Sequence, residues 1–118
     1  MGQAIETMAA KRSGESSGIR FRVSDTFVVP LRGQMLRLKL LDGKPSIKDL
    51  SPGKTIRLEA PGGDTRTVTI VDHAATGGRQ TQERLDQIRE LDIVISTEDA
   101  GTGDRRVAIG WFAGPSGG

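Results

Sequence analysis

Apolar and polar side chains alternate along two neighbouring stretches of the chain, residues 19–29 and 34–42. A period of two sends successive side chains to opposite faces of an extended strand, so that one face enters a core while the other meets solvent. The expected inward positions are Ile19, Phe21, Val23, Leu36, Leu38 and Leu40. Pro30 and the Arg32-Gly33 pair interrupt the pattern, which predicts a turn between two strands.

Further extended segments follow, separated by short stretches rich in glycine, aspartate and proline. They cover residues 55–59, 66–73, 91–97 and 105–113, with Ile56, Leu58, Val68, Ile70, Val107, Ile109 and Trp111 expected to face inward. Between residues 81 and 91, Leu85 and Ile88 stand among charged side chains and predict one short helix. This pattern predicts an all-β fold, a small six- or seven-stranded closed β-barrel, because closure removes exposed sheet edges.

The two ends of the chain lack the apolar surface that a packed domain needs. Residues 1–18 carry charges that cancel and finish in a glycine and serine cluster, and the last five residues read Gly-Pro-Ser-Gly-Gly. Such segments cannot offset the entropy that is lost on ordering. We therefore expect a disordered arm over residues 1–18, one barrel domain over residues 19–113 and a disordered tail over residues 114–118.

Gly53-Lys54-Thr55 has the ending of a phosphate-binding loop but not its spacing. Such a loop needs a glycine five residues before the Gly-Lys-Thr and a helix after it, so that backbone N–H groups can surround the phosphates. Lys48 occupies the glycine position, Pro52 removes an N–H, and the alternation that follows indicates a strand. The spacing therefore argues against nucleotide binding.

Three sequence stretches occur in an order that resembles the order of elements in a known family. FRVSDTFVVPLRGQMLRLKLLDGK joins a strand, a loop that ends in Arg-Gly and a second strand that leads to a glycine turn. The third strand is entered through the stretch IKDLSPGKTIRL. A further strand follows in TVTIVDH, and a short leucine-bearing segment and an apolar strand preceded by Asp follow in LDQIRELDIVIST. Over residues 19–113 this order resembles the second-domain β-barrel of translational GTPases such as elongation factor Tu.

The resemblance implies a barrel that in relatives touches RNA ends, partner domains or ribosomal surfaces. In this pattern Gly53 is the turn glycine that lets the chain swing into the third strand, and Lys54 stands where the family usually has Asp. The sequence shows no GTPase domain, so GTP hydrolysis is not implied. The matching positions are turn and core residues, and no individual binding residue is carried over.

Composition limits the partners and the chemistry. The 118-residue chain has no Cys and a net charge of +2, which excludes disulfides and thiolate metal sites and suits a reducing cytoplasm. No apolar run approaches the roughly 18 residues of a membrane span, and there is no signal-peptide core. With three Phe, one Trp and no Tyr, a platform of stacked rings for nucleic acid is disfavoured. We expect a cytoplasmic monomer with no membrane partner, no metal and no cofactor.

His73 and an acidic turn are the candidates for catalysis or cation binding. His73 is the only histidine, and neighbouring strand residues point to opposite faces, so a relay with Asp72 is geometrically poor. The stretch from Glu98 to Asp104 contains Asp99 and two glycines but lacks calcium-loop spacing, and a surface turn is the simpler interpretation. We predict no catalytic residues.

Basic residues on the first three strands are expected to point outward, opposite the aliphatic positions. They are Arg20, Arg22, Arg37, Lys39 and Arg57. Neighbouring strands would bring them within about 5–10 Å of one another, a spacing suited to phosphate contacts. The alternative is a solvated exterior on which Asp25, Asp42 and Glu59 balance these charges.

Three functional hypotheses follow. The favoured one is a non-catalytic module that binds RNA or a ribonucleoprotein through the five basic residues. The second is an adaptor that binds another protein through loop 74–92 and the exposed parts of Met35 and Leu41. The third is a hydrolase that uses His73 and the acidic turn.

Overall fold

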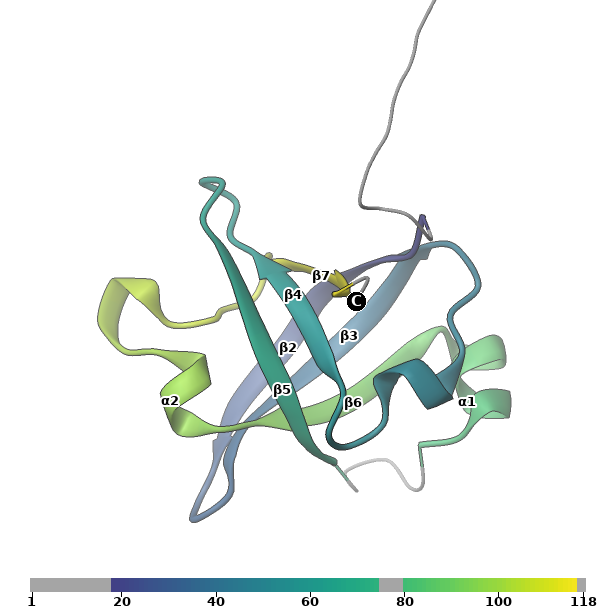
Figure 1. Cartoon of the computed structure of the whole chain (residues 1–118), viewed down its shortest axis with the longest axis horizontal. Helices are drawn as coiled ribbons and strands as arrows, with labels where there is room; N and C mark the ends of the chain where they lie inside the picture. Colours follow the sequence, from purple (N-terminus) through teal and green to yellow (C-terminus); the bar gives the residue numbers. More distant parts are fainter. Residues whose placement is uncertain (1–17, 75–79, 117–118) are drawn as a thin grey trace, which may run out of the picture.

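The structure is a computed structural model of the chain and describes residues 18–74 and 80–116. In these residues, six antiparallel strands pair in the cyclic order β2-β3-β6-β5-β4-β7 and close into a barrel (Figure 1). The strands are β2 (Arg20–Val29), β3 (Gly33–Asp42), β4 (Thr55–Glu59), β5 (Thr65–His73), β6 (Glu90–Ile95) and β7 (Phe112–Pro115). The predicted all-β barrel is confirmed.

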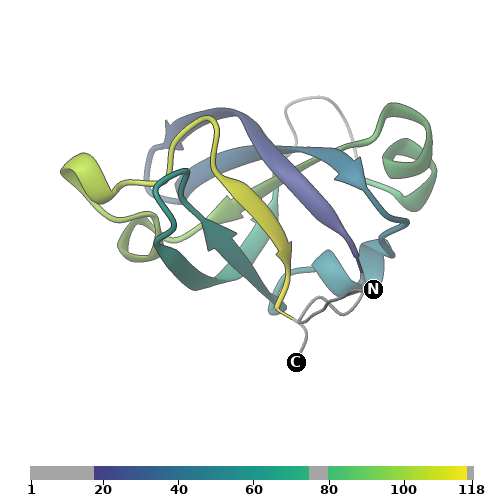
Figure 2. The same cartoon turned by 90° about the horizontal axis from the view of Figure 1, so that it is seen from above.

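Helical elements connect the strands outside the ring. They are η2 (Ile47–Leu50), α1 (Gln82–Ile88), α2 (Thr97–Ala100) and η3 (Gly103–Arg105). Helices α1 and α2 lie at opposite ends of the barrel in both views (Figures 1 and 2). The predicted helix is present as α1, where the Thr81 hydroxyl caps the Arg84 N–H and Leu85 is buried. Ile88, in contrast, is 50% exposed.

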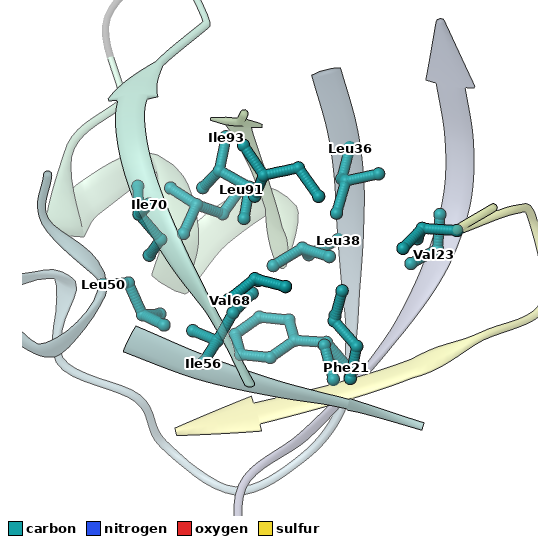
Figure 3. Packing of buried hydrophobic residues seen from close by; sticks show 14 of the residues in the cluster. Phe21, Val23, Leu36, Leu38, Leu50, Ile56, Val68, Ile70, Leu91 and Ile93 are labelled. Carbon is teal, nitrogen blue, oxygen red and sulfur yellow. The ribbon is translucent and has the colours of Figure 1, made fainter. Parts of the chain in front are cut away.

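The core contains the aliphatic side chains that the alternation predicts. One buried cluster includes Leu36, Leu38, Ile56, Leu58, Val68 and Ile70, none more than 1% exposed. Figure 3 shows several of these side chains directed from different strands into a common interior, together with Phe21. Burial of each large aliphatic side chain contributes about 1.5–3 kcal/mol to the free energy of folding. Packing across the ring therefore supplies the main stabilisation.

β7 closes the barrel although it is short. Ala113 is the partner of Phe21 on one side and of Leu58 on the other. Pairing continues through Gly114 and Pro115, which lie opposite Arg57 and Ile56. The predicted start of a disordered tail at residue 114 is therefore wrong for these two residues, because backbone pairing with β4 orders them. Residues 1–17 and 117–118 of the predicted arm and tail lie outside the described residues.

The segment between β6 and β7 differs from the prediction. A turn was expected at residues 98–104 and a strand at residues 105–113, but the chain forms α2 and η3 and becomes extended only at Phe112. Ser96 caps α2 by accepting the Asp99 N–H, and the Val107 N–H donates to the Ala100 carbonyl. Val107 is buried while Ile109 is 55% exposed, so strand alternation does not apply there.

Gly53 lies in the turn that leads into β4 and not in a phosphate-binding loop. Its φ of 94° is in the region that favours glycine, and its N–H donates to the Ile70 carbonyl at 2.8 Å. The backbone then continues directly into β4. The segment has neither the helix nor the outward-facing N–H groups that phosphate binding requires.

Within residues 18–74 and 80–116, none of the helices has the length and apolar character needed to cross a bilayer.

Gly33 is the glycine on which strand pairing depends most directly. Its φ is 138°, and a Cβ added there would overlap the Ile95 carbonyl oxygen of β6. We expect Gly33→Ala to lower the free energy of unfolding by about 3 kcal/mol, because the strands would have to separate. Urea denaturation measures this loss.

The matched control is Gly62→Ala, because no atom lies within 4 Å of an added Cβ at that turn. It should change stability by less than about 0.5 kcal/mol. Equal stability of the two variants would contradict the close approach of β3 and β6.

Candidate functional site

The five predicted basic residues all lie on the outer side of the barrel, but they do not form one stripe. Arg22 on β2 lies directly opposite Lys39 on β3. Arg20 lies near them, opposite Asp42. Arg57 on β4 is separated from β2 by β7, where its partner Gly114 has no side chain. The structure therefore brings three of the five basic residues together.

Arg37 points outward as expected, but two of its guanidinium nitrogens donate hydrogen bonds to the Asp92 carboxylate. Nε and Nη2 donate to Oδ1 and Oδ2 of Asp92 at 2.9 and 3.0 Å. The Asp92 side chain is fully buried and that of Arg37 is 30% exposed. These hydrogen bonds and the carboxylate charge raise the pKa of Arg37 above its ordinary value. Arg37 is therefore a structural residue, and we remove it from the candidate interface.

Main-chain bonds hold Asp92 in place from the β5 side. The Ala74 N–H donates to the Asp92 carbonyl at 3.0 Å. Gln80 bridges the same two residues, because its Oε1 accepts the Asp92 N–H and its Nε2 donates to the Ala74 carbonyl. The outer face of β3 and β6 is thus covered here. This covering also explains why Met35 is fully buried against Ala74 and Val94.

The remaining cations form a basic patch, which we define as Arg20, Arg22 and Lys39. All three side chains are exposed. Residues directly opposite on antiparallel strands have Cβ atoms about 4.5–5.5 Å apart, so Arg22 and Lys39 are close neighbours. Among the described residues, neither forms an ion pair within 4.0 Å. The patch therefore presents cations that are available to a ligand.

Phe112 adds an aromatic ring to the patch. It is half-buried on β7 directly opposite Arg22, and the Arg20 guanidinium lies over its ring, 4.0 Å from the centroid. This cation–π contact holds Arg20 near Arg22. The sequence analysis did not select Phe112. Its signal is the position next to Trp111, because an inward Trp at the start of a strand sends the following residue outward.

Carboxylates limit the extent of the patch. Lys39 lies opposite Glu90 on β6, and Phe112 lies opposite Glu59 on β4. The outward row from β4 to β6 thus has acidic residues at both ends and cations in the middle. This arrangement favours a narrow anionic ligand over a broad one, since a broad ligand would also meet Glu59 and Glu90.

His73 is held by the backbone of a neighbouring segment. Its Nε2 lies 2.8 Å from the Leu50 carbonyl, and its own N–H donates to Oδ1 of Asp72. Asp72 also pairs with Arg32, which lies in the turn between β2 and β3. The ring nitrogen therefore ties η2 to the end of β5, and it has no nucleophile partner among the described contacts.

The residues of the acidic turn also form hydrogen bonds within the fold. Asp99 Oδ2 accepts the Thr69 N–H at 3.1 Å. Arg66, which the sequence analysis missed, donates to the carbonyls of Asp99, Ala100 and Arg105 and lies over the Trp111 ring. In the described ranges, no group of His, Asp or Glu side chains could hold a metal ion.

The surface expected for an adaptor is only partly available. Met35 was expected to be partly exposed, but it is fully buried, because β6 and Ala74 cover it. Leu41 is 44% exposed. Residues 75–79 of loop 74–92 lie outside the described residues. The prediction for this surface therefore fails at Met35.

Comparison with models of known protein families gives no match, and no curated protein matches the chain.

The contrast between Arg37 and Arg22 can be tested by substitution. Arg37→Met removes the bidentate partner of a buried carboxylate and should lower the free energy of unfolding by about 3 kcal/mol, the lower end for buried pairs, because Arg37 is partly exposed. Arg22→Met should change it by less than about 0.5 kcal/mol. Thermal and urea denaturation check both values. Equal effects would mean that Arg37 does not hold Asp92.

Proposed function

We propose that the chain is a non-catalytic binding module that contacts RNA through the basic patch of Arg20, Arg22 and Lys39. The observation that supports this most is the placement of the Arg20 guanidinium over Phe112, beside the exposed pair of Arg22 and Lys39. The patch gathers cations despite a net charge of only +2. The resemblance to the second-domain barrel of translational GTPases favours the same class of partner.

The chemistry of the patch suits a phosphate backbone. Each cation that neutralises a phosphate releases counterions and contributes salt-dependent affinity. An arginine that is already held on a ring loses less side-chain freedom when it binds, because its position is fixed in advance. Phe112 also offers an aromatic surface beside the cations, on which an unpaired base could stack. A single strand of RNA fits between Glu59 and Glu90 better than a duplex does.

A hydrolase at His73 receives less support. The His73 ring contacts a main-chain carbonyl, and the acidic turn is bonded to β5 and Arg66. An adaptor role for loop 74–92 remains a second proposal, since Leu41 and Ile88 leave apolar surface exposed near it. An interface of that kind would resist salt, whereas phosphate contacts weaken as salt rises.

The RNA proposal is tested with labelled RNA and two charge-matched double variants. Arg20→Gln with Arg22→Gln removes two cations of the patch, and Lys44→Gln with Lys48→Gln removes two exposed lysines on and before η2. Fluorescence anisotropy with tRNA and with a short single strand, at roughly 50 to 200 mM salt, gives the affinities. We expect the patch variant to bind about tenfold more weakly and to lower the salt slope by about 1 to 2.

The lysine variant should bind nearly as the parent protein does. Circular dichroism melts check that both variants remain folded. Equal losses in the two double variants would show bulk charge attraction and not a site. Failure of the parent protein to bind either RNA at the lowest salt would reject the proposal.

A further inference from the structure

Strand β2 extends beyond its neighbour β7 and leaves an open edge. β2 pairs with β3 as far as Val29, but within the described residues it pairs with β7 at Phe21 and Arg22 alone. The Val23 N–H donates to the Trp111 carbonyl, and the Gly110 N–H donates to the Val23 carbonyl. Contact between β2 and the chain that leads into β7 therefore extends to Val23. The turn between β2 and β3 projects past the other strands (Figure 1). Closure of the barrel therefore does not protect residues 24–29 on this side.

The hydrogen bonds of the turn show which groups face the open edge. The Arg32 N–H donates to the Val29 carbonyl, so the backbone of Val29 faces β3. Because main-chain groups alternate along a strand, the N–H and C=O groups of Phe27 also face β3. Those of Thr26 and Val28 face the open side. The Thr26 N–H is accepted by Oδ1 of Asp25 at 2.9 Å. Val28 has both main-chain groups available to an added strand.

The side chains along this edge are unusually apolar for an exposed strand. Phe27 is 44% exposed and Val28 is 54% exposed, and they lie on opposite faces of the sheet. Asp25 is the only charged residue in the stretch 24–29. An exposed apolar edge of this kind is a template for strand addition. Of the two cations near this edge, Arg32 is paired with Asp72 and Arg106 donates to Oε1 of Gln34, so both already have partners within the chain.

We propose that the open edge of β2 pairs with the same edge of a second copy of the chain, antiparallel and around a two-fold axis at Phe27. In this register Thr26 lies opposite the partner's Val28, so both exchange main-chain hydrogen bonds. Phe27 meets the partner's Phe27 in a non-hydrogen-bonded pair, where side chains are closest. Asp25 lies opposite the partner's Val29, and the two Asp25 carboxylates do not face each other.

A second copy fits this edge because the contact is isologous. Both subunits supply the same alternation of main-chain groups and the same apolar side chains, as a two-fold interface requires. The net charge of +2 gives little repulsion between copies. This proposal differs from the monomer expected from the sequence. The proposed contact does not include Arg22 and Lys39, because they lie on the other side of Val23 from the paired stretch.

A cysteine at the axis tests the register. The chain has no Cys, so Phe27→Cys introduces a single thiol. Cα atoms of a non-hydrogen-bonded pair lie about 4.5 Å apart, within the range that a disulfide spans. We expect mild oxidation to convert Phe27→Cys to a covalent dimer at least about tenfold faster than Ile88→Cys, since pre-association raises the effective thiol concentration. Ile88 is a matched control, because it is 50% exposed on α1.

Sedimentation equilibrium of the full chain gives the second measurement. We expect reversible dimers at concentrations up to about 1 mM, and Phe27→Lys should weaken association about tenfold or more by placing like charges at the axis. Ile88→Lys should leave association unchanged. Asp25→Ala frees the Thr26 N–H and should strengthen the dimer.

Two results would overturn the proposal. One is a chain that stays monomeric over the whole concentration range. The other is oxidation of Phe27→Cys no faster than that of Ile88→Cys. Neither measurement involves RNA, so failure of the dimer and failure of the RNA site are separate outcomes.

Discussion

Closure of the strand ring is the constraint on which the rest of the structure depends. In the described residues, the four-residue strand β7 joins β2 to β4 and completes the cycle. Once the ring is closed, alternate side chains of every strand must enter one interior, and the aliphatic positions fill it. The remaining positions are forced outward. The basic patch, the carboxylates at its two ends and the ring of Phe112 are consequences of this division.

Much of the fold follows from alternation in the sequence. Period-two patterns give the positions of β2 to β5 and most of their inward residues, because a one-residue shift would expose the whole aliphatic set. A continuous apolar run gives the position of β6, in which five of six residues are buried. The segment after β6 could not be predicted in the same way. There, Ser96 caps a helical turn and Arg66 binds three carbonyls, so local hydrogen bonds outweigh a pattern that suggests a strand.

The candidate site was predictable only in part. The alternating pattern predicted that the basic side chains point outward. The partner of each basic side chain, however, depends on the register between strands that are distant in sequence. Arg37 on β3 contacts Asp92 on β6, 55 residues away in sequence, and nothing local to either residue indicates that the Asp92 carboxylate is buried. Arg22 and Lys39 belong to one hairpin, and their proximity was within reach of the sequence. Phe112 joins them only because β7 closes against β2.

The same closure separates two proposed surfaces. Where β7 covers β2, cations collect on the outer face, and where β7 ends, the edge of β2 is left open and apolar. The length of one short strand thus sets both the extent of the surface proposed to contact RNA and the position of the edge proposed to pair with a second copy.

Nuclear Overhauser effects at β7 test closure most directly. The structure places Ala113 opposite both Phe21 and Leu58, so the backbone protons of Ala113 should give cross-strand signals to both residues. Signals to Leu58 without any to Phe21 would describe an open sheet, in which the division into inner and outer faces no longer follows.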